Sequence, residues 1–251
     1  MAVDYRKEGR IAIFTINRPK VLNAINKQVE QELSEAILDF RDDPELWVGI
    51  ITGAGDRAFS SGHDINEERE TYPMAAEGCL VPAEHQVWKP FIAAICGYCL
   101  AGGLEIALSC DLRIAAENSV FGLPEINIGG IAQGGGTQRL PRMIPWCKAA
   151  EILLLGRHID AQEAYRIGLV NKVVPIEQLL PTAKQWAEIL CQAAPLSVRA
   201  TKEAMIRGYS MTLNEGLQLT RELANSLKNT EDSKEGIIAF QEKRKPQWKG
   251  R

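Results

Sequence analysis

Short runs of β-branched and apolar residues, separated by turns, mark the first half of the chain. We expect strands at Ile11–Asn17, Leu46–Thr52, Pro90–Cys96 and Leu112–Ala115, with a shorter one at Ser119–Phe121. Between the first two runs, apolar residues recur at helical spacing, which predicts a helix over Lys27–Arg41 with Asn26 as its N-cap. A second helix is expected to start at about Gly102.

Helical patterning dominates from Trp146 onward, and one strand-like run, Leu169–Val174, interrupts it. Asp160 with Glu163 resembles a capping box, and Thr212 with Glu215 fits that signature fully. The order of elements predicts an α/β core over residues 1–195 and a helical part over residues 196–251.

The stretch Glu67–Lys89 has no clean period and contains two prolines. Irregular segments of this length often form lids or pocket walls, so we expect it to shape a binding pocket. The roles of the individual residues of this stretch are left open.

Composition narrows the class of protein. The chain of 251 residues is 45% hydrophobic and 24% charged, which is typical of a globular protein with a large core. The net charge of −3 disfavours a dedicated nucleic-acid binder. No apolar run is long enough for a membrane span, and MAVDYRKEGR lacks the apolar region of a secretory signal. We therefore expect a cytoplasmic protein without a membrane partner.

Cysteine and histidine spacing gives no metal site. Cys96 and Cys99 form a C-x-x-C in an apolar context with no second pair nearby, so we interpret them as core residues. The three histidines lack zinc-binding spacing. No G-x-S-x-G elbow, complete phosphate loop or dinucleotide fingerprint is present either.

Two glycine-containing loops are candidates for an oxyanion hole. In the segment 58–65, Gly62 frees the backbone so that the N–H of His63 can point into a cleft. In the segment 100–105, Gly102 lies at a predicted helix start, where unpaired N–H groups and the helix dipole favour negative charge. Alternatively, both loops are ordinary glycine turns that pack strands against helices.

Two glutamates lie between apolar neighbours. Glu105 stands between Leu104 and Ile106, and Glu125 stands in the run 121–126. An apolar setting disfavours the charged carboxylate, which suits it to proton transfer, and two such groups across a cleft make an acid/base pair. The alternative is that each carboxylate is half-exposed or paired with Arg113 or Arg139.

The combined motifs resemble the enoyl-CoA hydratase (crotonase) superfamily over essentially the whole chain. The matching pieces are Asn17-Arg18-Pro19, Leu22-Asn23-Ala24, the segment 58–65, Lys89-Pro90, the segments 93–98 and 101–105, Cys110-Asp111, the segments 121–125 and 135–140, and the C-terminal segment 239–246. Each piece alone is weak, but their order and spacing are specific.

The resemblance implies a spiral of ββα units followed by a helical C-terminal oligomerisation region, in a homotrimer or a dimer of trimers. On matching positions, the backbone N–H groups of His63 and Gly102 hold the thioester oxygen of an acyl-CoA. Glu105 and Glu125 act as the acid/base pair of a hydratase, with Glu105 chiefly activating water and Glu125 supplying the proton to C2. No metal or other cofactor is implied, since CoA arrives as part of the substrate.

The resemblance also implies a CoA-binding set. Its members are Lys20, Val21, Leu22, Arg57, Ser61, Asp64, Ile65 and Asn66. The chain departs from the family pattern where Ala101 replaces a glycine, where Ala132-Gln133 replaces Pro-Gly, and where His63 replaces a small residue. Because Gln133 stands near the active-site segment, we expect a specialised acyl group that is cyclic, branched or polar.

Two other functions stay open from the sequence. A crotonase-fold isomerase, decarboxylase or synthase shares the oxyanion hole and differs in which carboxylate does the chemistry. An RNA-binding relative is disfavoured by the acidic charge and by the lack of aromatic residues along a basic face.

Overall fold

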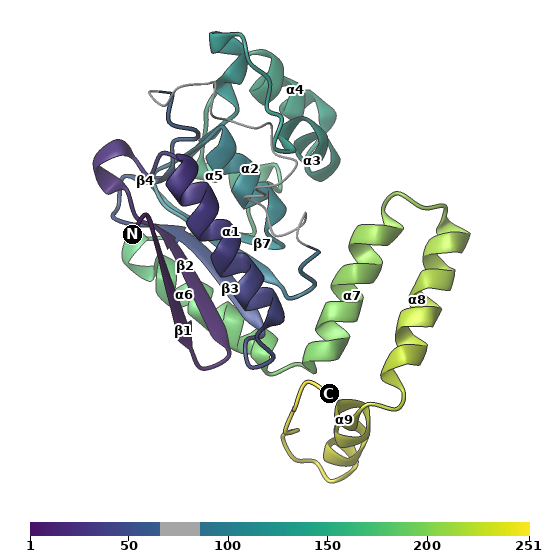
Figure 1. Ribbon diagram of the computed structural model, residues 1–251. Coiled ribbons are helices and arrows are strands. Elements are labelled where there is room, and N and C mark those ends of the chain that lie inside the picture. Colours follow the sequence, from purple (N-terminus) through teal and green to yellow (C-terminus); the bar gives the residue numbers. More distant parts are fainter. Residues whose placement is uncertain (66–85) are drawn as a thin grey trace.

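The computed structural model describes residues 1–65 and 86–251 (Figure 1). Its strands are β1 (Val3–Glu8), β2 (Ile11–Ile16), β3 (Val48–Gly53), β4 (Ala58–Ser60), β5 (Phe91–Ile95), β6 (Tyr98–Leu100), β7 (Leu112–Ala116), β8 (Val120–Gly122), β9 (Ile159–Asp160) and β10 (Lys172–Val174). Its α-helices are α1 (Lys27–Asp42), α2 (Gly102–Ser109), α3 (Gly136–Met143), α4 (Trp146–Leu154), α5 (Ala161–Arg166), α6 (Ile176–Cys191), α7 (Pro195–Gly208), α8 (Leu213–Leu227) and α9 (Glu231–Gln241). The short 3₁₀ helices η1 (Pro19–Val21) and η3 (Pro124–Ile128) carry parts of the site.

Successive strands alternate between two sheets. The larger sheet has the order β1-β2-β3-β5-β7-β10, and the smaller has the order β4-β6-β8-β9. The chain therefore passes from β3 to β4, from β5 to β6 and from β7 to β8, and each pass advances one strand in both sheets. This is the spiral of ββα units that the resemblance implies.

The larger sheet is buried on both faces. It is parallel from β2 to β10, and only the edge strand β1 runs antiparallel to its neighbour. Neighbouring residues of one strand enter different apolar clusters: Ile51 joins the cluster that contains α1 and α2, whereas Ile50 packs against α6. Figure 1 shows α1 and α6 on opposite faces of this sheet.

Helix α1 follows from its sequence. The Asn26 side chain accepts a hydrogen bond from the Val29 N–H at 3.1 Å, and the apolar stripe of the helix is buried. At the other end, Lys89 Nζ donates to the carbonyl oxygens of Phe40 and Asp43, both at 2.6 Å. The buried ammonium thus satisfies carbonyls at the end of the helix that have no partner within it.

Helices α7 and α8 form an antiparallel hairpin that stands beside the core, and α9 lies near its base (Figure 1). The capping box of α8 is formed, because Glu215 N–H donates to Thr212 Oγ1 and Glu215 Oε2 accepts from Thr212 N–H. Large apolar side chains stay exposed on these helices: Met205, Leu213, Ile237 and Phe240. The division into a catalytic core and an oligomerisation region stays a prediction.

The sequence pattern located the buried elements well and missed the edge strand β1 and the short strand β6. The helix expected over residues 27–41 ends one residue later, and the strand expected at Leu46 begins at Val48. Strand β1 was missed because its outer residues are exposed at a sheet edge. Strand β6 was missed because it has three residues and follows β5 directly.

Cys96 and Cys99 are core residues, as their apolar context predicted. Both are buried and free, and burial raises the pKa of the Cys96 thiol to about 11 and that of Cys99 well above its usual value. A thiol held neutral in this way is a poor nucleophile.

Ala101, which caps α2, has the left-handed backbone that usually calls for glycine. Its φ is 48° and its ψ is −126°. For a residue with a Cβ this conformation costs about 1–2 kcal/mol. The strained residue directly precedes Gly102. Ala101, which replaces a glycine of the family pattern, therefore lies at the start of the helix.

We expect Ala101→Gly to stabilise the protein by about 1 kcal/mol, because the backbone strain removed exceeds the added freedom of the unfolded chain. Urea unfolding measures the change. As a control, Ala224→Gly within α8 should cost about 1 kcal/mol, since that position has ordinary helical backbone. An equal loss of unfolding free energy in both variants would contradict backbone strain at residue 101.

Candidate active site

The loop that carries His63 is held by Ile25. The Ile25 N–H donates to the Gly62 carbonyl at 2.8 Å, and the Asp64 N–H donates to the Ile25 carbonyl at 2.8 Å. In such a parallel bridge, the N–H of the residue between the two bonded ones points to the opposite side. The backbone N–H of His63 is therefore turned away from Ile25.

Helix α2 begins close to this loop. A Cβ placed on Gly62 would lie 3.4 Å from Gly102 N and 2.7 Å from Ala101 Cβ, and Gly62 has a φ of +95°. Only glycine meets both conditions. Because α2 starts at Gly102, the first amides of the helix have no carbonyl one turn earlier to bind. The structure thus brings two predicted oxyanion donors, the amides of His63 and Gly102, close together.

Glu105 lies in the first turn and a half of α2 and is only 4% exposed. Its Oε1 accepts a hydrogen bond from the Gly136 N–H at 2.9 Å. Burial raises the pKa of Glu105, and the amides of Gly136 and Gly134 offset part of that rise. A Cβ on Gly134 would lie 2.6 Å from Glu105 Oε2, so the glycine-rich loop is shaped around this carboxyl group.

Glu125 comes from η3, whose end is closed by the Gly130 N–H donating to the Glu125 carbonyl at 2.9 Å. Its Oε2 is buried and has no hydrogen-bond partner among the described residues. Burial raises the pKa of Glu125, and the charge of Glu105 raises it further. The two carboxyl groups therefore lie close enough to interact electrostatically.

Neither arginine forms the ion pair with a glutamate that the sequence left open. Arg113 is buried and donates to the carbonyls of Leu169 and Cys110, both at 2.7 Å. Arg139 Nη1 donates to the Gly134 carbonyl at 2.8 Å. Arg139 thereby holds the loop 134–136 in place, and its charge also lowers the pKa of Glu105, although the two groups form no direct ion pair.

Most residues of the predicted CoA-binding set meet at one rim. The Asn23 side chain donates to the carbonyls of Ala54 and Ala58, at 3.0 and 2.6 Å, and so ties η1 to the turn that carries Arg57. The Ser61 N–H donates to the Leu22 carbonyl at 3.0 Å. Lys20, Val21 and Arg57 are exposed at this rim, and Leu22 and Ser61 are half-buried.

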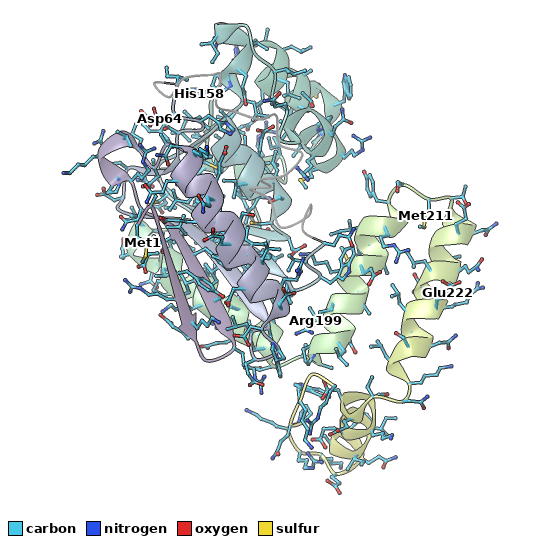
Figure 2. The ribbon with its side chains drawn as sticks, viewed as in Figure 1. Met1, Asp64, His158, Arg199, Met211 and Glu222 are labelled. Carbon is cyan, nitrogen blue, oxygen red and sulfur yellow. The ribbon has the colours of Figure 1, made fainter. Side chains whose placement is uncertain are left out.

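Asp64 and Ile65 lie at the end of the same loop, and Figure 2 shows Asp64 on the core, away from the hairpin with Met211 and Glu222. The Asp64 carboxylate contacts Arg18 Nη2 at 3.0 Å, whereas Ile65 is exposed. Gln133 is exposed and lies in the loop whose Gly136 amide binds the Glu105 carboxyl group. Asn66 and most of the segment 67–89, up to residue 85, lie outside the described residues.

Sequence reasoning assigned no role to Arg18, Asn23 or Glu30, which the structure places at the site. Arg18 and Asn23 fix the rim, and the Asn23 side chain is fully buried. Both belong to the motifs that carry the family resemblance, and for Asn23 the available signal was a polar residue between two apolar neighbours, Leu22 and Ala24. Glu30 lies 3.5 Å from His63 Nε2 across 33 residues of sequence, and no local pattern reveals such a contact.

Neither a metal centre nor a membrane span is found in the described part of the chain. Over residues 1–65 and 86–251, no group of three or more His, Cys, Asp or Glu side chains is placed to hold a metal ion. The helices of the same ranges are too short or too polar to cross a bilayer.

Comparison with known proteins decides the family. The enoyl-CoA hydratase/isomerase family model matches residues 6–251. The chain belongs to this family. It is 42% identical to (E)-benzylidenesuccinyl-CoA hydratase of Thauera aromatica over the full length of both chains. It is 44% identical to a probable mitochondrial enoyl-CoA hydratase of Dictyostelium discoideum, over 96% of this chain and 88% of that protein.

Solved structures of the enoyl-CoA hydratase/isomerase family share the fold. The crystal structure of enoyl-CoA hydratase EchA1 from Mycobacterium marinum has a TM-score of 0.95 and 39% identity, and covers 100% of this chain and 99% of that one. The crystal structure of an enoyl-CoA hydratase from Mycobacterium tuberculosis matches with the same TM-score at 38% identity and with the same coverage. The fold predicted from the motifs is thereby confirmed.

The electrostatic interaction between the two carboxyl groups predicts a measurable coupling. We expect both glutamates to titrate above the ordinary carboxyl range of about 4, because burial disfavours their charged forms. In Glu105→Gln, the pKa of Glu125 should fall, since a neighbouring negative charge is gone. Carbon-13 NMR of the side-chain carboxyls measures both values. An unchanged pKa of Glu125 in this variant would contradict an interaction between the two carboxyl groups. Glu188→Gln on α6 serves as the control.

Proposed function

We propose that the protein is an enoyl-CoA hydratase, which adds water reversibly across the C2=C3 bond of an α,β-unsaturated acyl-CoA. One observation carries the proposal: the buried carboxyl group of Glu105 and the half-buried one of Glu125 both have raised pKa values and interact electrostatically, and the start of α2 lies against the His63 loop. Family membership supports it, since several relatives are named as hydratases of enoyl-CoA substrates.

In the proposed mechanism, the N–H groups of His63 and Gly102 bind the thioester oxygen. Their donation draws electrons from C3 and stabilises the enolate that forms when water attacks. The helix dipole of α2 adds partial positive charge at Gly102. Removing one donor of this kind typically costs about a hundred- to a thousandfold in rate.

Proton transfer is assigned to the two glutamates. Glu105 accepts a proton from the attacking water, whose oxygen bonds to C3, and the electron pair of the double bond moves toward the thioester. Glu125, in its protonated form, then gives its proton to C2; Glu105 afterwards releases its proton to solvent and Glu125 takes one up, which restores the starting protonation states. The hydrogen bond from Gly136 N–H to Glu105 supports the charged form of Glu105. The buried Oε2 of Glu125 is the atom assigned to proton delivery.

The proposal includes no cofactor. Addition of water neither oxidises nor reduces the substrate as a whole, and both proton transfers are assigned to side chains of the chain. CoA enters as part of the substrate. We assign its contacts to the rim residues Lys20, Val21, Leu22, Arg57, Ser61, Asp64, Ile65 and Asn66, supported by their gathering at one edge, apart from Asn66.

The proposal further includes a substrate with a specialised acyl group. The relatives from Thauera aromatica and Citrobacter koseri are named for benzylidenesuccinyl-CoA and carnitinyl-CoA, whose acyl groups carry further polar substituents. Gln133, on the loop that holds Glu105, provides an amide for such a group. In a competition assay, a clear preference for crotonyl-CoA over branched, cyclic and polar enoyl-CoAs would contradict this part.

We expect hydration of at least one enoyl-CoA in a mixed panel, seen by mass spectrometry as a gain of one water. Glu105→Gln should lower kcat by about a hundred- to ten-thousandfold, because the amide cannot accept the proton of water. Glu188→Gln on α6 should leave kcat unchanged. If Glu105→Gln keeps the wild-type activity while Glu125→Gln loses it, the reaction is the isomerisation that the family also includes.

We also propose that the chain assembles as a homotrimer or a dimer of trimers. The support is a groove between α7 and α8 lined by small and apolar side chains, including Ala200, Ala204, Met205, Leu223 and Leu227. Exposed Phe240 and Ile237 on α9 extend the apolar surface. Exposed apolar area on this scale is typical of contacts between subunits, and a second copy is the proposed occupant.

Light scattering after gel filtration should give three or six times the mass of one chain. The double variant Met205→Asp, Phe240→Asp should shift the mass toward the monomer, because two charges would be buried at the contact. Gln178→Asp on α6 is the matched control and should keep the wild-type mass. A wild-type protein that elutes as a monomer at micromolar concentration would contradict the assembly.

A further inference from the structure

Arg139 stands at a position in α3 where a positive charge is unfavourable. The helix begins at Gly136, so Arg139 belongs to its first turn, where the helix dipole favours anions over cations. Side chains of a helix tilt toward its N-terminus, and the half-buried Arg139 side chain follows this direction back to the loop 134–136. There its Nη1 donates to the Gly134 carbonyl at 2.8 Å. The contact with the loop therefore holds the cation against the dipole.

The loop 134–136 joins Arg139 to Glu105. On one side, the Gly136 N–H donates to Glu105 Oε1 at 2.9 Å. On the other side, the main-chain N–H of Arg139 donates to the Gly135 carbonyl at 2.7 Å, in addition to the bond made by the guanidinium. A Cβ on Gly135 would overlap that guanidinium, and the φ of Gly135 is +110°. The place of the amide that binds the carboxyl group thus depends on Arg139.

Arg139 also acts on Glu105 through its charge. Glu105 interacts electrostatically with Arg139 from α3, with His63 from the loop after β4 and with Glu125 from η3. An arginine side chain stays protonated throughout the pH range of an activity assay. The charge of Arg139 lowers the pKa of Glu105, and the amides of the loop act in the same direction. Arg139 therefore favours the carboxylate both directly and through the loop that it holds.

We propose that Arg139 is a positioning residue, which holds the loop 134–136 against the Glu105 carboxyl group and keeps Glu105 oriented and ionised as the base that activates water. The proposal rests on the proposed hydratase function. In that reaction the carboxylate accepts a proton from water, so protonated Glu105 is inactive. A displaced loop would misdirect the carboxylate, and loss of the cation would increase the fraction of the inactive form.

Arg139→Met removes the charge and the hydrogen bond to Gly134 and keeps most of the side-chain length. We expect kcat on the best substrate of the panel to fall about tenfold at about pH 7, as for loss of one hydrogen bond to a charged group. KM should change by less than about twofold, since Arg139 contacts the loop 134–136 and not the CoA rim. The pKa of Glu105 should rise, so the loss of kcat should grow as the pH is lowered.

Carbon-13 NMR of the side-chain carboxyls gives the pKa of Glu105, and the acid limb of the kcat profile should move to higher pH with it. Arg139→Lys keeps a positive charge and should restore part of kcat and most of the shift in the pKa of Glu105. Arg142→Met, in the same helix, is the matched control. Arg142 is exposed and its Nη1 bonds to Gln138, so both readouts should stay as in the wild type.

Circular dichroism checks that the variants fold. If Arg139→Met does not fold, Arg139→Gln replaces it, because the amide is neutral and the same rise in the pKa of Glu105 is expected. An unchanged pKa of Glu105 in the neutral variant, a wild-type kcat, or a loss of kcat that is equal at every pH would overturn the proposal. The NMR readout needs no turnover. If the wild-type protein hydrates no enoyl-CoA while the pKa of Glu105 depends on Arg139, the proposed function is contradicted and the control of Glu105 by Arg139 stands.

Discussion

The burial of the Glu105 carboxyl group is the constraint on which the site depends. Removing a carboxylate from water costs several kcal/mol unless hydrogen bonds replace its hydration. The fold provides these bonds with backbone amides of the loop 134–136, and that loop can approach only because it carries glycines. The residual cost is visible as the raised pKa of Glu105. The same imbalance that destabilises the charged form raises the pH at which the group exchanges its proton above that of an exposed carboxyl group.

The architecture explains why these groups meet. Each pass of the spiral adds one strand to each sheet, so loops that are distant in sequence are stacked in adjacent layers. The His63 loop follows β4, Gly102 follows β6 and η3 follows β8, and these three strands are neighbours in the smaller sheet. The candidate site therefore lies beyond the carboxyl ends of three neighbouring strands of one sheet, in agreement with the general placement of ligand sites in parallel sheets.

Much of this could be predicted from the sequence, and the limits are physical. The strands β2, β3 and β5 and the helix α1 were found because each has a strong period and a clear boundary. Glu105 and Glu125 were selected as candidates because a carboxylate between apolar residues is costly, and the structure shows the expected rise in the pKa of each. The contacts of Glu30 with His63 and of Asn23 with Ala58 were not found, because they join segments far apart in sequence through side chains whose directions depend on the whole fold.

The hydrogen bonds of the proposed CoA-binding rim have a mechanical consequence. Arg18 links the start of η1 to Asp64, and the Ser61 N–H donates to the Leu22 carbonyl, so the rim and the His63 loop are joined by direct hydrogen bonds. Contacts made by the distant nucleotide end of a substrate would then be transmitted to the amide of His63, ångströms from the reacting bond. A substrate shortened at that end would lose turnover as well as affinity, because binding energy released at the rim helps to align the reacting carbonyl.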